Sequence, residues 1–248
     1  MKKYLATLHS KCELGTGLFG LWLEFDELVD VGPGQFFEFT TGVKFLRRAI
    51  SVADAQENRL LFVFRVVGEG TKWLSELTPG VELNLIGHLG KQVEMPQQGP
   101  VMLLGGGVGV APLLYLARTL YHAKIPTYAV LAASSANQLI LVDEFRPLCS
   151  ELTLVTDDGS LGYKGLLPEV IPNLTILPEI TKFYACGPEP MFVAINKLSL
   201  NKPVYAFLES RMGCGVGLCV GCAVAGKDGA YHRVCTEGPV FKLEDVIL

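Results

Sequence analysis

The sequence predicts an antiparallel β-barrel, then an α/β domain with a parallel sheet, then a small cysteine-rich segment. Short apolar runs separated by turn residues fill the stretch from about residue 4 to 94, as is typical of barrels and sandwiches. Apolar strands then alternate with helical patterns, which favours a parallel sheet with helices on both faces. Between Arg211 and Gly238 there are seven glycines and four cysteines, so we expect something other than apolar packing to organise this part.

The expected barrel covers residues 1–97. Its strands are expected at many short apolar runs, for example Leu18–Phe25, Gln35–Phe39, Arg59–Val67 and Val81–Ile86. Turn sequences such as Val31-Gly32-Pro33-Gly34 lie between them, and Gly and Pro supply the backbone angles that chain reversals require. The stretch 96–100, rich in Pro and Gln, indicates a linker.

The expected α/β domain covers residues 98–209, where strands and helices alternate. The strands are expected at Val101–Leu104, Tyr128–Ala133, Leu152–Thr156, Phe183–Cys186 and Tyr205–Leu208. Helices are expected at Leu113–Leu120, Val142–Leu148, Leu166–Ile171 and Pro190–Leu198. This alternation is the pattern of a nucleotide-binding sheet.

Composition excludes several classes of protein. Half of the 248 residues are hydrophobic and 19 % are charged, with a net charge of −4, which excludes a disordered chain. No basic tract indicates nucleic acid, and the longest apolar runs are far shorter than the ~20 residues of a membrane span. Because the N-terminus also lacks a signal-peptide pattern, we expect a cytoplasmic protein, whose seven cysteines stay reduced.

Four of these cysteines have the spacing of an iron–sulfur site. Cys214, Cys219, Cys222 and Cys235 follow the pattern Cys-x4-Cys-x2-Cys with a distant fourth cysteine, which is the plant-type [2Fe–2S] ligand run. Zinc is the alternative, but its four-cysteine sites are usually built from two Cys-x2-Cys pairs, and the chain has one here. Disulfides are disfavoured in the cytoplasm. Residues 210–248 are therefore expected to form a small [2Fe–2S] domain.

Two turns of the α/β domain indicate a dinucleotide site. The first joins an expected strand to an expected helix and contains Gly105, Gly106, Gly107, Val108, Gly109 and Pro112. Glycines there let a pyrophosphate approach the backbone at the helix N-terminus, although a tight turn without a ligand gives the same pattern. The second turn contains Cys186, Gly187 and Pro188 at the same expected sheet edge. By itself, Cys186 is as readily explained as a small buried side chain.

These motifs together resemble one family. In chain order they are Arg48-Ala49-Ile50-Ser51, Gly68-Glu69-Gly70-Thr71, the Gly105–Pro112 turn, Cys186-Gly187-Pro188 and the four tail cysteines. The chain resembles the ferredoxin–NADP reductase superfamily over its whole length. Within it, the chain is most similar to electron-transfer subunits of the NAD-dependent (type B) dihydroorotate dehydrogenases.

The resemblance implies an FAD site in the barrel. Arg48 would pair with a flavin phosphate, Ile50 and Ser51 would line the isoalloxazine, and Gly70 and Thr71 would form a turn on the pyrophosphate. Phe64 and Arg65 match the strand beside the flavin. Ala49 stands where the family usually has proline, which loosens the turn without removing a ligand group. From composition alone, both arginines would be equally well explained as solvated surface residues.

The resemblance also implies a function. Electrons would pass between the flavin of an FMN-containing catalytic subunit and NAD, through [2Fe–2S] and FAD, as dihydroorotate is oxidised to orotate. Two copies of each subunit would form a heterotetramer. No acid–base side chain is expected, because the cofactors carry the chemistry, although Cys186 would lie at the edge of the nicotinamide stack. Alternatives are an electron-transfer subunit of a sulfide dehydrogenase or hydrogenase, a redox sensor without turnover, or a zinc-stabilised interaction module.

Two expectations concern specificity and docking. The stretch Leu131–Asn137 contains no cation for a 2′-phosphate, so NAD is favoured over NADP. The turn Thr156-Asp157-Asp158-Gly159 follows the next strand and is expected either to offer a carboxylate to a ribose hydroxyl or to be a plain acidic turn. Apolar residues between Met212 and Val220 have little core to join, so several of them are expected to be exposed and to face the partner; folding over the cluster is the alternative.

Overall fold

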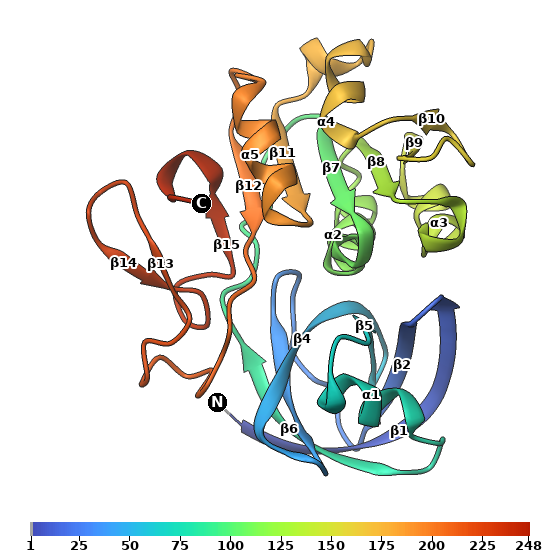
Figure 1. The fold of residues 1–248 in the computed structure, drawn as a ribbon, viewed down its shortest axis with the longest axis vertical. Helices are drawn as coiled ribbons and strands as arrows, with labels where there is room; N and C mark the ends of the chain where they lie inside the picture. The colour runs from blue at the N-terminus through green and yellow to red at the C-terminus, as the bar shows by residue number, and fades with distance from the viewer. Residues whose placement is uncertain (1) are drawn as a thin grey trace.

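A closed six-stranded barrel forms the N-terminal part of the computed structural model, which describes residues 2–248 (Figure 1). Its strands pair antiparallel in the order β1-β2-β5-β4-β3-β6. They are β1 (Lys2–Gly15), β2 (Leu18–Phe25), β3 (Phe36–Thr41), β4 (Lys44–Gln56), β5 (Arg59–Arg65) and β6 (Glu82–Leu89). Apolar side chains such as Phe37, Phe39 and Phe62 fill the barrel. The expected antiparallel barrel is confirmed.

Three barrel elements were not among the expected ones: β1, β4 and the helix α1 (Glu69–Glu76). The outward-facing residues of β1 are largely charged or polar, so its sequence carries only a weak apolar signal. Charged residues interrupt β4 in the same way. Helix α1 starts among glycines, which by themselves favour a turn, yet Leu74 anchors it by packing fully buried in the barrel core.

The second part is a seven-stranded sheet in the order β10-β9-β8-β7-β11-β12-β15. Its strands are β7 (Val101–Gly106), β8 (Thr127–Ala133), β9 (Glu151–Thr156), β10 (Tyr163–Lys164), β11 (Lys182–Cys186), β12 (Val204–Phe207) and β15 (Val240–Lys242). All neighbours are parallel except β12 and β15. The expected parallel sheet is therefore confirmed, with one antiparallel strand added at its edge.

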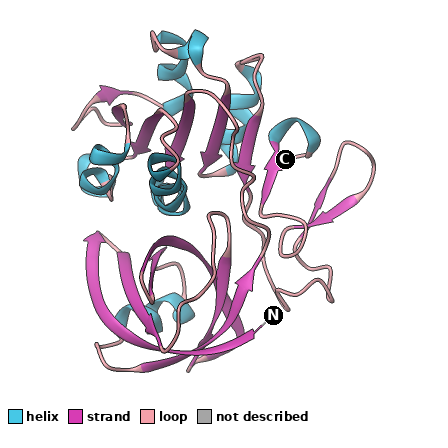
Figure 2. Ribbon diagram, turned by 180° about the vertical axis from the view of Figure 1, so that it is seen from behind, coloured by secondary structure: helices cyan, strands magenta, loops and turns pink. Residues whose placement is uncertain are grey.

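Helices cover both faces of this sheet, as expected (Figure 2). Helices α2 (Val110–His122) and α3 (Val142–Phe145) pack in the core on one face. Helices α4 (Leu167–Val170) and α5 (Glu189–Lys197) pack in the core on the other face. None of the helices within residues 2–248 combines the length and apolar character that a membrane span needs.

The C-terminal segment lies beside both larger parts (Figure 1). It contains a short hairpin, β13 (Ala223–Ala225) with β14 (Tyr231–Arg233), and then strand β15. Strand β15 pairs with β12, and the following Leu243 packs in the sheet core. The paired strands β12 and β15 of the sheet thus hold the two ends of the cysteine-containing stretch, and the hairpin lies within it, between Cys222 and Cys235.

An ion pair joins the barrel to the sheet domain. Asp54 of β4 is 2 % exposed, and Arg118 of α2 donates hydrogen bonds to both of its carboxylate oxygens, at 2.7 and 2.8 Å. Arg118→Leu is expected to reduce the free energy of unfolding by roughly 3 kcal/mol or more, because it leaves a buried carboxylate without its cation. Urea unfolding measures the loss. The control Arg146→Leu, at an exposed arginine, should change stability by less than about 0.5 kcal/mol; equal effects of both variants would contradict the prediction.

Candidate functional site

A cavity of about 300 Å³ lies where the barrel meets the nucleotide domain. Neighbouring strands β4 and β5 supply most of its barrel wall. The lining includes seven residues that the sequence placed at the flavin: Arg48, Ala49, Ile50, Ser51, Phe64, Arg65 and Thr71. The fold therefore brings together residues from three separate stretches of the sequence.

Gly70, the remaining residue of that set, lies against Arg48. A Cβ atom at Gly70 would lie 2.5 Å from Nε of Arg48, so only glycine lets the guanidinium rest on the first turn of α1. The Thr71 hydroxyl orders this turn by accepting hydrogen bonds from the N–H groups of Val67 and Gly68. A cation beside the N-terminus of a helix is a favourable place for a phosphate, so these residues fit the pyrophosphate of FAD.

A second cavity of about 530 Å³ lies at the carboxyl edge of the parallel strands. Its lining includes Gly106, Gly107, Val108 and Gly109 of the first turn and Gly187 and Pro188 of the second. The two turns touch, because a Cβ atom at Gly109 would lie 2.5 Å from the carbonyl oxygen of Cys186. Bare backbone at this edge fits a dinucleotide pyrophosphate.

Three residues of the predicted nucleotide set do not line this cavity. Pro112 lines the barrel cavity instead. Gly105 is buried in β7, where a Cβ atom would lie 2.7 Å from Cγ1 of Val110, so its role is to let helix α2 pack closely. Cys186 is 2 % exposed and lies in the apolar core, with burial and the nearby Glu209 raising the pKa of its thiol. Its side chain therefore lies behind the cavity wall as a neutral thiol.

The two cavities adjoin, since Arg65, Val108 and Glu209 line both of them. Sequence reasoning missed Glu209. It lies just after β12, at the same carboxyl edge as the two glycine turns, and that position is the signal that indicates it. Although Glu209 is exposed to the cavities, desolvation by its neighbours raises the pKa of its carboxyl group. A nicotinamide and a flavin in the two cavities would meet at these residues.

The wall of the nucleotide cavity beyond the ends of β8 and β9 carries a carboxylate. Asp157 lines it, together with Ala132, Ala133 and Ser134 from the end of β8. Arg65, at the junction with the barrel cavity, is the one arginine or lysine among the described lining residues. The remaining wall comes from Leu166–Pro168, Pro190, Met191 and Ala194, which the sequence did not indicate. This lining favours a ribose hydroxyl over a 2′-phosphate.

The four tail thiols are free and stand as two pairs. Cys214 Sγ accepts hydrogen bonds from the N–H groups of Val216 (3.5 Å) and Cys219 (3.4 Å). These bonds lower the pKa of the Cys214 thiol to about 7, and the bond from Val216 has the largest effect. Burial, followed by the neighbouring Cys222 thiol, raises the pKa of Cys235 to about 11. Cys214 thus belongs with Cys219, and Cys222 with Cys235.

Two pairs of thiols fit a [2Fe–2S] cluster, in which each iron takes two cysteine ligands. Two glycines of the loop, Gly215 and Gly217, have φ angles of +65° and +82° that other residues rarely adopt. The buried hydroxyl of Thr236, beside Gly217, has no hydrogen-bond partner within the described chain, so a donor is available for a sulfur atom.

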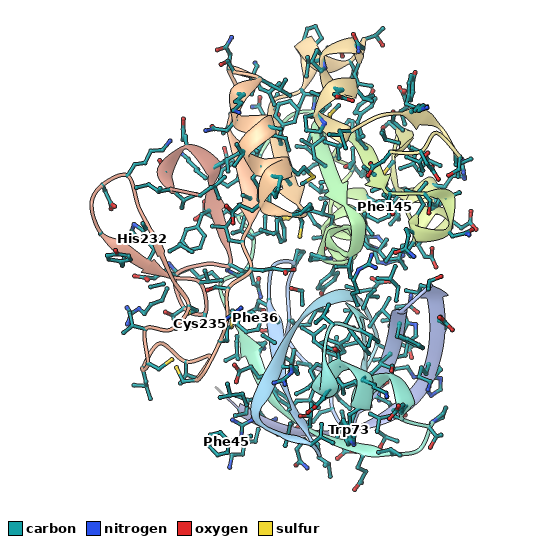
Figure 3. All side chains as sticks on the ribbon, viewed as in Figure 1. Phe36, Phe45, Trp73, Phe145, His232 and Cys235 are labelled. Carbon is teal, nitrogen blue, oxygen red and sulfur yellow. The ribbon has the colours of Figure 1, made fainter. Side chains whose placement is uncertain are left out.

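One side chain connects the cysteines to the barrel cavity. Phe36 of β3 lines that cavity and packs in the same apolar core as Cys222 and Cys235. Figure 3 labels Phe36 and Cys235, which both belong to this core. One apolar core therefore reaches from the wall of the candidate flavin site to the cysteines of the candidate cluster site.

This combination of barrel cavity, adjoining nucleotide cavity and cysteine loop defines a flavin- and nicotinamide-dependent reductase with an iron–sulfur centre. Residues 209–247 match the family model described as the iron-sulfur cluster binding domain of dihydroorotate dehydrogenase B. The chain is 38% identical over 221 residues to the dihydroorotate dehydrogenase B (NAD(+)) electron transfer subunit of Caldanaerobacter subterraneus subsp. tengcongensis, covering 87% of each chain. It is 35% identical over 226 residues to that of Geobacillus thermodenitrificans, again covering 87% of each. The chain belongs to the family of dihydroorotate dehydrogenase B electron transfer subunits, as the sequence motifs indicate.

Solved structures agree with this assignment. The structure of an NADH-dependent reduced ferredoxin-NADP oxidoreductase, studied for flavin-based electron bifurcation, superimposes with a TM-score of 0.90 and 30% identity, covering 98% of this chain and 89% of that chain. The ferredoxin reductase of carbazole 1,9a-dioxygenase superimposes with a TM-score of 0.72 at 23% identity, covering 82% of this chain and 66% of that chain. The second likeness supports the fold alone.

Proposed function

We propose that this chain is the electron-transfer subunit of an NAD-linked oxidoreductase that oxidises dihydroorotate to orotate for pyrimidine biosynthesis. One observation carries the proposal: the nucleotide cavity, the barrel cavity and the paired cysteines follow one another, with Arg65 and Glu209 at the first boundary and Phe36 at the second. When bound, FAD converts the two-electron hydride of NADH into single electrons, which a [2Fe–2S] cluster carries one at a time.

The chain's own residues bind and orient the reactants. Arg48, Gly70 and Thr71 hold the flavin pyrophosphate, and Ile50, Ser51 and Phe64 shape the wall beside the ring. The glycine turns hold the pyrophosphate of NAD, while Arg65 and Glu209 set the position of the nicotinamide against the flavin. Cys214, Cys219, Cys222 and Cys235 hold the cluster. Cys186 supports the junction from behind, next to Glu209, rather than by direct contact.

The substrate is oxidised on a partner. We propose an FMN-containing catalytic subunit, assembled with this chain as a heterotetramer with two copies of each, in the cytoplasm, where the ligand thiols stay reduced. A bifurcating reductase is the second candidate, favoured by the 30% identity to the NADH-dependent reduced ferredoxin-NADP oxidoreductase over 98% of this chain.

Purification of the chain with its natural partner tests the proposal. Co-purification of an FMN protein, absorption of flavin and [2Fe–2S], and bleaching of both by NADH are expected. The purified complex is also expected to reduce orotate with NADH, or to reduce NAD with dihydroorotate. A colourless zinc protein, or a coloured protein that NADH does not bleach, would contradict the proposal. Reduction of ferredoxin and NADP without any reaction with dihydroorotate would favour the second candidate.

We expect NADH to reduce the bound flavin at least roughly tenfold more efficiently than NADPH. Near Ala132–Ser134 and Asp157 a 2′-phosphate gains no charge-assisted hydrogen bond, and each such bond contributes about 1.5–3 kcal/mol. Stopped-flow reduction with both nucleotides measures the ratio. Ser134→Arg should move the ratio toward NADPH, whereas equal efficiencies in the unaltered chain would show that a cation reaches the phosphate from elsewhere.

A further inference from the structure

A glutamate of the barrel is buried under the cysteine loop. Glu38 lies in β3 between Phe37 and Phe39, which point into the barrel, so its own side chain points outward. It is nevertheless only 1 % exposed. Its cross-strand neighbours are Ala49 of β4 and Ile86 of β6, neither of which offers a polar side chain.

The loop that carries the cluster ligands covers the side chain of Glu38. A Cβ atom at Gly215 would lie 2.7 Å from Oε1 and 3.0 Å from Oε2 of Glu38. Gly215 directly follows Cys214, and consecutive Cα atoms are ~3.8 Å apart. The carboxylate therefore lies beneath the backbone next to a cluster ligand. Any side chain at position 215 would displace it.

The carboxylate is not there for stability. Oε2 of Glu38 is buried and has no hydrogen-bond partner among residues 2–248, and leaving such a group unsatisfied is costly. Burial raises the pKa of the Glu38 carboxyl, and the charge of Arg47 acts in the opposite direction. An unsatisfied buried polar atom in a native protein calls for an explanation, and a redox role is one such explanation.

We propose that Glu38 sets the reduction potential of the [2Fe–2S] cluster, its carboxylate making the cluster harder to reduce. The inference rests on the cluster assignment of the proposed function. Net charge near a cluster is one of the properties that determine its potential. At an effective dielectric constant of ~20, a unit charge about 12 Å from the cluster changes a one-electron equilibrium by roughly tenfold. This corresponds to a shift of ~59 mV in the reduction potential.

The test is a redox titration of the holo complex, followed by the electron paramagnetic resonance of the reduced cluster, at alkaline pH so that the carboxylate is ionised. Glu38→Gln keeps the size of the side chain and removes its charge, so a potential higher by roughly 59 mV is expected. The matched control is Glu82→Gln, which removes the same charge from an exposed position of the same barrel and should leave the potential unchanged because water and salt screen it.

The outcomes separate this inference from the function on which it rests. A wild-type protein without a [2Fe–2S] signal would overturn the proposed function. A wild-type signal with an unchanged or lower potential in Glu38→Gln, at unaltered iron and flavin content, would overturn the role of Glu38 alone. Should Glu38→Gln lose the cluster, Glu38→Asp is measured: it withdraws the charge from Gly215 by one methylene, so a smaller rise supports the inference and the absence of a rise overturns it.

Discussion

Replacing Cys219 with serine is expected to abolish the iron and sulfide content of the protein while most of the flavin remains bound. Cys219 supplies half of the thiol pair that it forms with Cys214, whose Sγ accepts the Cys219 N–H at 3.4 Å. With one thiolate missing, the loop between these residues has little other reason to keep its shape, because two of its glycines have positive φ angles and its apolar packing is sparse. The flavin cavity has no lining residue from positions 213–235, so it should survive the change.

Iron and acid-labile sulfide analysis, together with the visible spectrum, measures this loss. Cys12→Ser is the matched control, since Cys12 is likewise free and exposed but lies in the barrel. The control should keep the full iron content. Retention of the cluster spectrum and of the full iron content in Cys219→Ser would remove Cys219 from the ligand set.

The sequence predicts the ligand groups of this site better than its shape. The cysteine spacing and the glycine turns are local signals, because a cluster loop and a pyrophosphate turn each depend on residues close together in the chain. Glu209 and Phe36 reach the site only because distant segments meet there: Glu209, just after β12, lines both cavities, and Phe36 of β3 lines one. No short motif marks such a residue, and the rule that ligands bind at the carboxyl edge gives only its neighbourhood.

The sequence also does not show whether a residue at the end of a strand faces the cavity or the core. Cys186 and Gly105 lie in the expected turns, yet one is a buried thiol and the other a packing position. Strand β1 and helix α1 have weak sequence patterns of their own. Pairing with β2 and β6 stabilises β1, and the burial of Leu74 stabilises α1. Tertiary packing decides in each of these cases.

The cysteine loop presents two of its apolar side chains to solvent and turns two inward. Leu218 and Val220 are 83 % and 55 % exposed, whereas Met212 and Val216 pack partly buried against the core that contains Cys222 and Cys235. From the sequence, these residues could either face the partner subunit or fold over the cluster. In the structure, two of them are exposed and two pack inward. An exposed leucine beside a one-electron centre is well placed to contact the catalytic subunit, because aliphatic side chains that are exposed in the free chain are covered in a permanent complex.

Leu218→Glu is therefore expected to lower electron transfer to the catalytic subunit at least roughly a hundredfold, because a carboxylate buried in the interface without a partner costs several kcal/mol. NADH-dependent reduction of a small dye should stay unchanged, since the cavities lie elsewhere. The matched control is Leu161→Glu, at an exposed leucine next to β10, at the sheet edge opposite β15. It should leave both activities intact. Loss of both activities in Leu218→Glu would mean that the leucine shelters the cluster, and full activity with the catalytic subunit would place the docking surface on another face of the chain.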